Sequence, residues 1–191
     1  MHFGQTCHAG TRIYVHDDVY GEFVAAYTKQ MASLKVGDNF DESVDQGPQN
    51  SKMHSKVAEV EGGDGKGYYI QPTIFTNVKP DMEIMREDIF GPVVCCIAKF
   101  KTEEEVLRDA NDTTYGLAAA VHTTDYERVL RITNGVKAGT IWMNMYNFVH
   151  WSIPFGGYKQ SGIGRECGEA ALEKYTETKA VYYNMAIPAP K

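Results

Sequence analysis

Residues 93–144 run VVCCIAKFKTEEEVLRDANDTTYGLAAAVHTTDYERVLRITNGVKAGTIWMN, and this stretch decides the fold. Short apolar runs alternate in it with segments whose apolar residues recur at helical spacing. Thr102 with Glu105 three residues later is a typical helix start, and Gly135 is a typical helix stop. The predicted elements are a strand at Val93–Phe100, a helix at Thr102–Ala110, a strand at Leu117–Val121, a helix at Asp125–Asn134 and a strand at Gly139–Asn144. This alternation predicts an α/β fold with a mostly parallel sheet flanked by helices.

The flanking sequence continues the pattern on both sides. Towards the N-terminus we expect a strand at Arg12–Val15 and then a helix that Asp17 or Asp18 caps and that buries one face. The other expected elements are a short helix at Asn50–Val60, a strand at Tyr68–Phe75, a helix at Glu166–Tyr175 and an edge strand at Ala180–Met185. We find no boundary for a second domain, so residues 1–191 are expected to belong to one domain.

The composition argues against several classes of partner. The chain has 19 Lys and Arg against 25 Asp and Glu, a formal net charge of -6, and no basic block that could neutralise a phosphate backbone. No apolar run approaches the roughly 20 residues that span a bilayer. The 43% hydrophobic content fits an ordinary soluble globular protein. We therefore expect neither a nucleic-acid partner nor a membrane span.

The cysteines bear on compartment and on metal binding. The chain contains Cys7, Cys95, Cys96 and Cys167. They are too few and too irregularly spaced for a disulfide framework, and none belongs to a CxxC or Cys/His zinc spacing. We therefore expect reduced thiols, no metal site and a cytoplasmic location, with the mitochondrial matrix as the alternative.

Cys7 is the strongest candidate for a catalytic side chain. It lies in Gly4-Gln5-Thr6-Cys7-His8-Ala9-Gly10-Thr11-Arg12, where small residues would let a carbonyl group approach the sulfur and the nearby backbone N–H groups. A cysteine chosen at random is more often an inert buried residue. The adjacent His8 adds little to the local argument, because neighbouring residues in a chain often point apart.

The same string resembles the active-site cysteine motif of the aldehyde dehydrogenase superfamily. Two further blocks resemble that family in the same order along the chain, Glu87-Asp88-Ile89-Phe90-Gly91-Pro92-Val93 and Ile153-Pro154-Phe155-Gly156-Gly157-Tyr158-Lys159-Gln160-Ser161-Gly162-Ile163-Gly164-Arg165-Glu166. Ordered motifs separated by long stretches are hard to obtain by chance. The similarity runs through nearly the whole chain, so it implies a domain of that family.

The resemblance implies a reaction. In the family, the deprotonated cysteine attacks an aldehyde, the thiohemiacetal loses a hydride to a nicotinamide cofactor, NAD or NADP, and water hydrolyses the resulting thioester to a carboxylic acid. Carried over to this chain, Cys7 is the nucleophile and its own backbone N–H donates to the oxyanion. The substrate is then a small-molecule aldehyde.

Asp88 and Phe90 are the candidates for cofactor binding. Asp88 matches the position of a glutamate that holds the ribose hydroxyls of the nicotinamide nucleotide, and Phe90 matches a residue that packs near the nicotinamide ring. The carboxylate of Asp88 is one methylene shorter than the family's, and Glu87 is a possible substitute. Alternatively, Glu87 and Asp88 only solvate a helix end and Phe90 belongs to the core.

The candidates for substrate binding lie later in the chain. Phe155 matches an aromatic residue beside the substrate, and Asn144 matches an asparagine near the active site. An aromatic loop that corresponds to the family's substrate entrance follows Asn144, with Tyr146, Phe148, His150 and Trp151. The loop indicates an apolar or aromatic aldehyde, or else core or interface packing. Asn144 has the alternative of turning the chain where a strand ends.

The chain also departs from the family pattern. Family members carry a dinucleotide-binding domain, a water-activating glutamate and an oxyanion-hole asparagine ahead of this region, so we expect a fragment or a truncated form of a catalytic domain. The segment between Gln49 and Gly67 is shorter than the family's by roughly fifteen residues. Residues 176–191 resemble the strand and tail through which family homo-oligomers pair. Without that partner strand we expect poor solubility or self-association.

Three functions from different classes follow. The first is a fragment of an aldehyde-oxidising enzyme that keeps its nucleophile but is inactive alone. The second is a non-catalytic truncated subunit that pairs through its C-terminal strand with a full-length homologue. The third is a hydrolase or acyl-transfer remnant that uses Cys7 without a nicotinamide.

Overall fold

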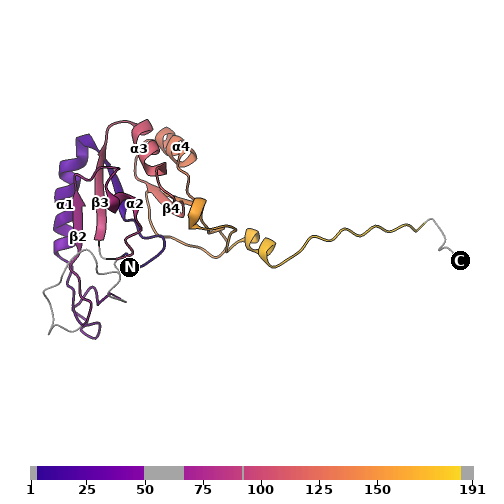
Figure 1. Ribbon diagram of the computed structural model, residues 1–191, viewed down its shortest axis with the longest axis horizontal. Coiled ribbons are helices and arrows are strands. Elements are labelled where there is room, and N and C mark those ends of the chain that lie inside the picture. The colour runs from indigo at the N-terminus through magenta and orange to yellow at the C-terminus, as the bar shows by residue number, and fades with distance from the viewer. Residues whose placement is uncertain (1–3, 50–66, 92, 186–191) are drawn as a thin grey trace.

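The computed structural model describes residues 4–49, 67–91 and 93–185 (Figure 1). Its main body is a three-stranded sheet in the order β1-β3-β2, with every pair parallel. A second, two-stranded parallel sheet pairs β4 with β5. The strands are β1 (Arg12–His16), β2 (Thr73–Thr76), β3 (Val93–Phe100), β4 (Ala118–Val121) and β5 (Thr140–Met143). The α-helices are α1 (Tyr20–Ala32), α2 (Glu83–Arg86), α3 (Glu103–Asn111) and α4 (Tyr126–Gly135).

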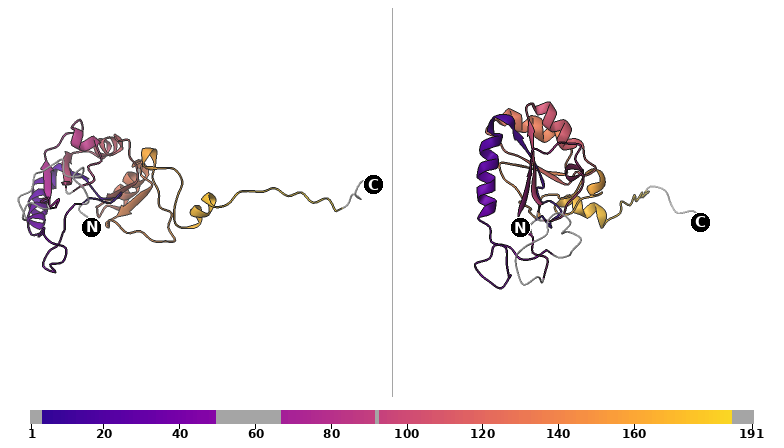
Figure 2. Two further views of the ribbon diagram at one scale, coloured as in Figure 1. Left: turned by 60° about the horizontal axis from the view of Figure 1, so that its bottom comes forward. Right: turned by 60° about the vertical axis from the view of Figure 1, so that its left-hand side comes forward.

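Two hydrophobic clusters hold the three-stranded sheet. Successive residues of a strand point to opposite faces, and consecutive residues of β3 accordingly belong to different clusters: Ile97, which is fully buried, and Ala98. The Ile97 cluster includes Val15 and the α1 residues Tyr20, Phe23, Val24 and Tyr27. The Ala98 cluster includes Met85 of α2. Figure 2 shows α1 lying along one side of this sheet, so both faces contribute to the core.

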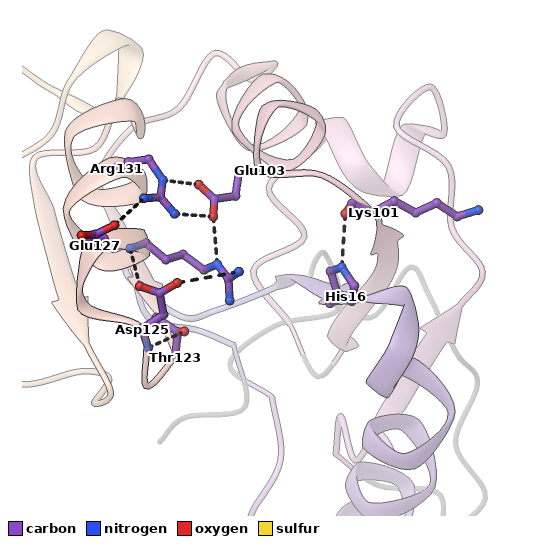
Figure 3. Close-up of polar contacts among 8 residues, drawn as sticks. His16, Lys101, Glu103, Thr123, Asp125, Glu127 and Arg131 are labelled. Atoms are coloured by element: carbon purple, nitrogen blue, oxygen red, sulfur yellow. Dashed lines mark hydrogen bonds and ion pairs between the residues drawn. The ribbon is translucent and has the colours of Figure 1, made fainter.

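Helices α3 and α4 are capped and joined by polar side chains. The hydroxyl of Thr102 accepts from the Glu105 N–H at 3.2 Å, and the Asp125 carboxylate accepts from the Arg128 N–H at 3.0 Å. Glu103 accepts from Arg128 at 2.9 Å and from Arg131 at 2.7 Å, so one carboxylate joins the two helices (Figure 3). The hydrogen bonds from these arginines lower the pKa of Glu103 to about 2.

The predicted fold class is confirmed: the structure is α/β, with parallel sheets flanked by helices. The predicted strand Val93–Phe100 is β3 with the same bounds, and β1, α3, β4, α4 and β5 lie within one residue of the predicted bounds. The described strands form two sheets, a division that the alternation of elements does not specify. Strand β2 begins only at Thr73, after Pro72, because proline has no N–H to donate to a neighbouring strand.

The predicted cap of α1 is wrong. Asp17 and Asp18 lie in a 3-10 turn, η1 (Asp17–Val19), whose own cap is the His16 side chain. The residue before α1 is Val19, and no side chain caps the helix there. Asp17 instead forms ion pairs with Lys99 and Lys101 at 3.6 and 3.9 Å, because β1 and β3 are neighbouring strands.

The predicted C-terminal elements also differ from the structure. The helix expected at Glu166–Tyr175 is a 3-10 helix, η4 (Glu169–Lys174), because Cys167 and Gly168 have φ angles of 60° and 59°, which a right-handed helix cannot contain. The edge strand expected at Ala180–Met185 is not formed. This segment is exposed and extends away from the body (Figure 1), and a strand needs a neighbour with which to pair.

The helix predicted at Asn50–Val60 lies outside the described residues. Within the described part of the chain, no helix has the length and apolar character needed to cross a membrane.

Candidate active site

The cysteine loop, residues 4–12, leads directly into β1. Cys7 is exposed, and a backbone hydrogen bond of 2.9 Å from the Ala9 N–H to the Thr6 carbonyl turns the chain around it. Gly4 has a φ of 77° and lies so close to the carbonyl of Gly91 that a side chain would collide with it. Glycine at position 4 therefore lets the cysteine loop pack against the second motif, residues 87–93.

Arg12 forms the second link between the cysteine loop and the second motif. Its guanidinium donates to the Met85 carbonyl at 2.9 Å and acts electrostatically on Asp88. Partial burial of the carboxyl raises the pKa of Asp88, while the Arg12 charge and the Phe90 N–H oppose the shift. The residue as a whole remains exposed, so its carboxylate is accessible to a polar ligand.

Phe90 has a strained backbone. Its φ of 47° lies in the left-handed region, which is unusual for a bulky residue and costs roughly 1–2 kcal/mol. Its side chain is half-buried. Strain of this kind clusters at ligand-binding sites, where surrounding contacts maintain it. The structure thus holds Asp88 and Phe90 beside the start of the cysteine loop.

His8 connects the cysteine loop to the aromatic loop and to the third motif, residues 153–166. The His8 ring lies 5.7 Å from that of Phe155 in an edge-on arrangement and 6.1 Å from that of Trp142. The hydroxyl of Tyr146 donates to the His8 carbonyl at 2.7 Å, and its ring lies 5.0 Å from that of Trp142. Burial raises the pKa of Tyr146. Phe155 and Tyr146 therefore both contact His8, the residue that follows Cys7 in the chain.

Two hydrogen bonds place the side chain of His8 itself. Its Nδ1 lies 3.4 Å from the Cys7 Sγ, and its Nε2 contacts Oδ1 of Asn147 in the aromatic loop. The two neighbouring side chains therefore point toward each other. The reason for discounting His8, that adjacent side chains often point apart, does not hold for this pair.

Asn144 and Phe148 lie differently from the other candidates. The side-chain amide of Asn144 accepts from the Thr123 N–H and donates to the Thr123 carbonyl, both at 2.9 Å. The φ angle of Asn144 is 51°. This placement favours the chain-turning alternative. Phe148 is 53% exposed, and its carbonyl accepts from the Trp142 indole at 2.8 Å. Its side chain is free to meet a ligand or another chain.

The structure thus brings the second motif and the third motif against the cysteine loop, so that all three sequence motifs meet. Sequence reasoning missed Asn147, which no local pattern marks, and it missed Trp142, which has the character of an ordinary strand residue. In the ranges 4–49, 67–91 and 93–185, no three His, Cys, Asp or Glu residues are grouped as metal ligands would be.

Comparisons with known proteins all point to aldehyde dehydrogenases. The profile described as "Aldehyde dehydrogenase family" matches residues 1–181. An aldehyde dehydrogenase of Alternaria alternata is 48% identical over 194 residues, covering 93% of this chain and 39% of that protein. The NAD+ complex of an aldehyde dehydrogenase from Bacillus cereus has a TM-score of 0.89 at 41% identity, covering 96% of this chain and 40% of that one.

A point mutant of betaine aldehyde dehydrogenase from Staphylococcus aureus, in complex with NAD+ and with a BME-modified cysteine, has a TM-score of 0.85. It is 36% identical, and the match covers 91% of this chain and 39% of that one. The chain spans about two fifths of the length of the relatives that it matches.

Proposed function

This chain belongs to the aldehyde dehydrogenase family, and from that premise we propose that it supplies the nucleophilic cysteine of an enzyme that oxidises an aldehyde to a carboxylic acid. One observation carries the proposal. The three motifs, far apart in the sequence, meet around the loop that holds the exposed Cys7. A relative with a BME-modified cysteine supports a reactive thiol in the family.

The proposed chemistry begins at Cys7. Its thiolate attacks the aldehyde carbon, a sulfur–carbon bond forms, and the carbonyl electron pair moves to oxygen. The Cys7 N–H donates to that oxyanion, and such a contact typically contributes about 3 kcal/mol. Loss of hydride converts the thiohemiacetal to a thioester, which water hydrolyses to release the acid.

The cofactor is proposed to be NAD or NADP, which supplies the hydride acceptor when bound. Asp88 would hold ribose hydroxyls and Phe90 would pack near the nicotinamide. The accessible carboxylate of Asp88 and the strained backbone of Phe90 fit these roles. NAD+ complexes of two relatives support the choice of cofactor class.

The proposed substrate is an apolar or aromatic aldehyde. Phe155 and Tyr146 would line its path, because both contact His8 beside the nucleophile. Phe148 would contribute from the exposed part of the aromatic loop. Asn144 would act indirectly, by fixing the turn that precedes the aromatic loop.

We further propose that residues 1–191 are part of a catalytic domain and have no dehydrogenase turnover on their own, because they match only about two fifths of the relatives. Residues 176–191 would pair with another chain, in a homo-oligomer or on a full-length homologue. The free thiols of Cys7 and Cys167 fit a reducing compartment, the cytoplasm or the mitochondrial matrix.

A chimera provides the test. This chain would replace the matching two fifths of the Bacillus cereus relative, and NAD(P)H formation at 340 nm would be followed with aliphatic and aromatic aldehydes. We expect turnover in the chimera and none in the 191-residue chain. Cys7→Ser in the chimera should abolish turnover, whereas Cys167→Ser should leave it unchanged.

Two other outcomes would favour the alternatives. Turnover that survives Cys7→Ser would remove Cys7 from the mechanism. Ester hydrolysis by the 191-residue chain that Cys7→Ser abolishes, together with an inactive chimera, would favour the hydrolase remnant. Co-purification with a full-length homologue, again with an inactive chimera, would favour the non-catalytic subunit.

A further inference from the structure

Three side chains form a continuous hydrogen-bonded series at the nucleophile. Cys7 Sγ lies 3.4 Å from His8 Nδ1, and His8 Nε2 contacts Oδ1 of Asn147. A nucleophile within reach of a base, with the base oriented by a third group, is the arrangement that activates nucleophiles in enzymes. We propose that His8 is a catalytic base that takes the proton of Cys7, and that Asn147 is the residue that positions it.

The hydrogen-bond partners determine where the His8 proton resides. The Oδ1 atom of Asn147 only accepts, so Nε2 of His8 carries the ring proton and donates it. Nδ1 then has its lone pair free and faces the Cys7 sulfur. The two ring nitrogens have distinct roles, and a single partner on Nε2 sets both.

The proton transfer balances within the pair. The S–H bond of Cys7 breaks, an N–H bond forms at His8 Nδ1, and a thiolate and an imidazolium result. Attack on an aldehyde then places the negative charge on the carbonyl oxygen while the proton remains on His8. This role rests on the proposed function of Cys7 as nucleophile, but the transfer itself requires neither an aldehyde nor a dinucleotide.

The surroundings of His8 hold the ring in this orientation. The rings of Trp142 and Phe155 contact it from two directions, and Tyr146 fixes the backbone through the His8 carbonyl. Asn147 has a φ of 64°, a conformation that asparagine tolerates better than most residues. A half-buried ring held on several sides is pre-organised for proton transfer.

The test measures the alkylation of Cys7 by iodoacetamide in the 191-residue chain at pH 7, with peptide mass spectrometry reporting Cys7 and Cys167 separately. His8→Phe keeps an aromatic ring between Trp142 and Phe155 but removes both nitrogens. We expect the Cys7 rate to fall by about tenfold or more, because only the thiolate reacts. The Cys167 rate should not change.

His16→Phe is the matched control, because this histidine also packs against an aromatic ring, that of Phe100, but contacts the Lys101 carbonyl at the far end of β1 from the cysteine loop. It should leave Cys7 alkylation unchanged. His8→Gln is the second variant of the base and should show the same loss as His8→Phe. Asn147→Ala should slow Cys7 about threefold or more, and Asn147→Asp, which keeps the acceptor oxygen, should restore the rate.

An unchanged Cys7 rate in both His8 variants would overturn the proposal, and so would an Asn147→Asp variant no faster than Asn147→Ala. These outcomes are separate from the fate of the proposed function. If Cys7→Ser abolishes turnover in the chimera while His8→Phe does not slow alkylation, the function stands and the base assignment fails. If turnover survives Cys7→Ser while His8→Phe slows alkylation, the proton transfer from Cys7 to His8 stands, but the proposed function fails and the catalytic role of His8 fails with it.

Discussion

The body around β3 and the segment from residue 144 to 185 differ in how far they bury their apolar side chains. Ile97 in the centre of the sheet is fully buried, and clusters lie on both faces of its strand. In the later segment Ile163 is 98% exposed and Tyr182 is 94% exposed. Single exposed apolar residues are ordinary, whereas a segment rich in them is typical of surfaces that take part in interactions.

The chain therefore contains a packed core and a segment that leaves large apolar side chains in solvent. The cysteine loop contacts both regions: Gly4 and Arg12 join it to Gly91 and Met85 of the body, and His8 contacts Phe155 of the later segment. The extended tail departs from the body, as Figure 1 shows. Substitutions that affect one region and leave the other unchanged therefore test the division.

The largest effect is expected in the core. Ile97→Ala leaves a cavity between β3 and α1 and should reduce the free energy of unfolding by about 2–5 kcal/mol. Ile163→Ala removes the same atoms from an exposed position and should change it by less than about 0.5 kcal/mol. Urea unfolding followed by circular dichroism measures both. Equal losses in the two variants would contradict the division.

The second effect is expected in association. We expect the chain to self-associate through its exposed tail, and Tyr182→Ser with Tyr183→Ser to raise the dissociation constant by about tenfold, which is about 1.4 kcal/mol. Phe40→Ser, at a 96% exposed residue that precedes the tail by more than a hundred positions, is the control and should change nothing. Sedimentation velocity over a range of concentrations is the measurement. A wild-type chain that stays monomeric would refute the expectation.

The third effect isolates one buried hydroxyl. Tyr20 donates to the Ile97 carbonyl at 3.2 Å and accepts from the Asn77 N–H at 2.9 Å. Tyr20→Phe leaves both groups without that partner and should cost about 1–3 kcal/mol of unfolding free energy. Tyr182→Phe removes an exposed hydroxyl and should have no measurable effect. A Tyr20→Phe variant as stable as wild type would show that this hydroxyl does not help join α1 to the sheet.

The fold could be predicted where the information is local. Periodicity and caps identify β3, α3 and α4, because Thr102 and Asp125 act within three residues of their partners. The failures depend on contacts or on backbone geometry. The tail cannot form a strand without a neighbour, and the left-handed Cys167 and Gly168 delay the last helix in a way that residue types do not reveal.

The site could be predicted in part for the same reason. Cys7 lies in a local motif, whereas His8 and Asn147 are separated by 139 positions and only the folded chain brings them together. The roles of Asp88 and Phe90 stay predictions. The sequence could not show that Arg12 and Gly4 join that motif to the cysteine loop.

The smallest effect on stability is expected at the contact between α3 and α4. Helix α3 packs against β3, and α4 packs against β4. Glu103 accepts hydrogen bonds from Arg128 and Arg131 there, on the surface, so water screens the pairs. Glu103→Gln should lower the melting temperature by about 1–3 °C at pH 7. Glu104→Gln, at the exposed neighbouring position, should leave it unchanged.

The pH dependence of that difference separates ion pairing from packing. The arginines lower the pKa of Glu103 from 4.5 to about 2, so its stabilisation is full above pH 4.5 and disappears as the pH falls through about 2. The melting temperatures of wild type and Glu103→Gln should therefore converge between pH 4.5 and 2, as circular dichroism would show. A gap that stays constant over this range would mean that the side chain acts by its shape, and that the contact between α3 and α4 belongs to the packed body.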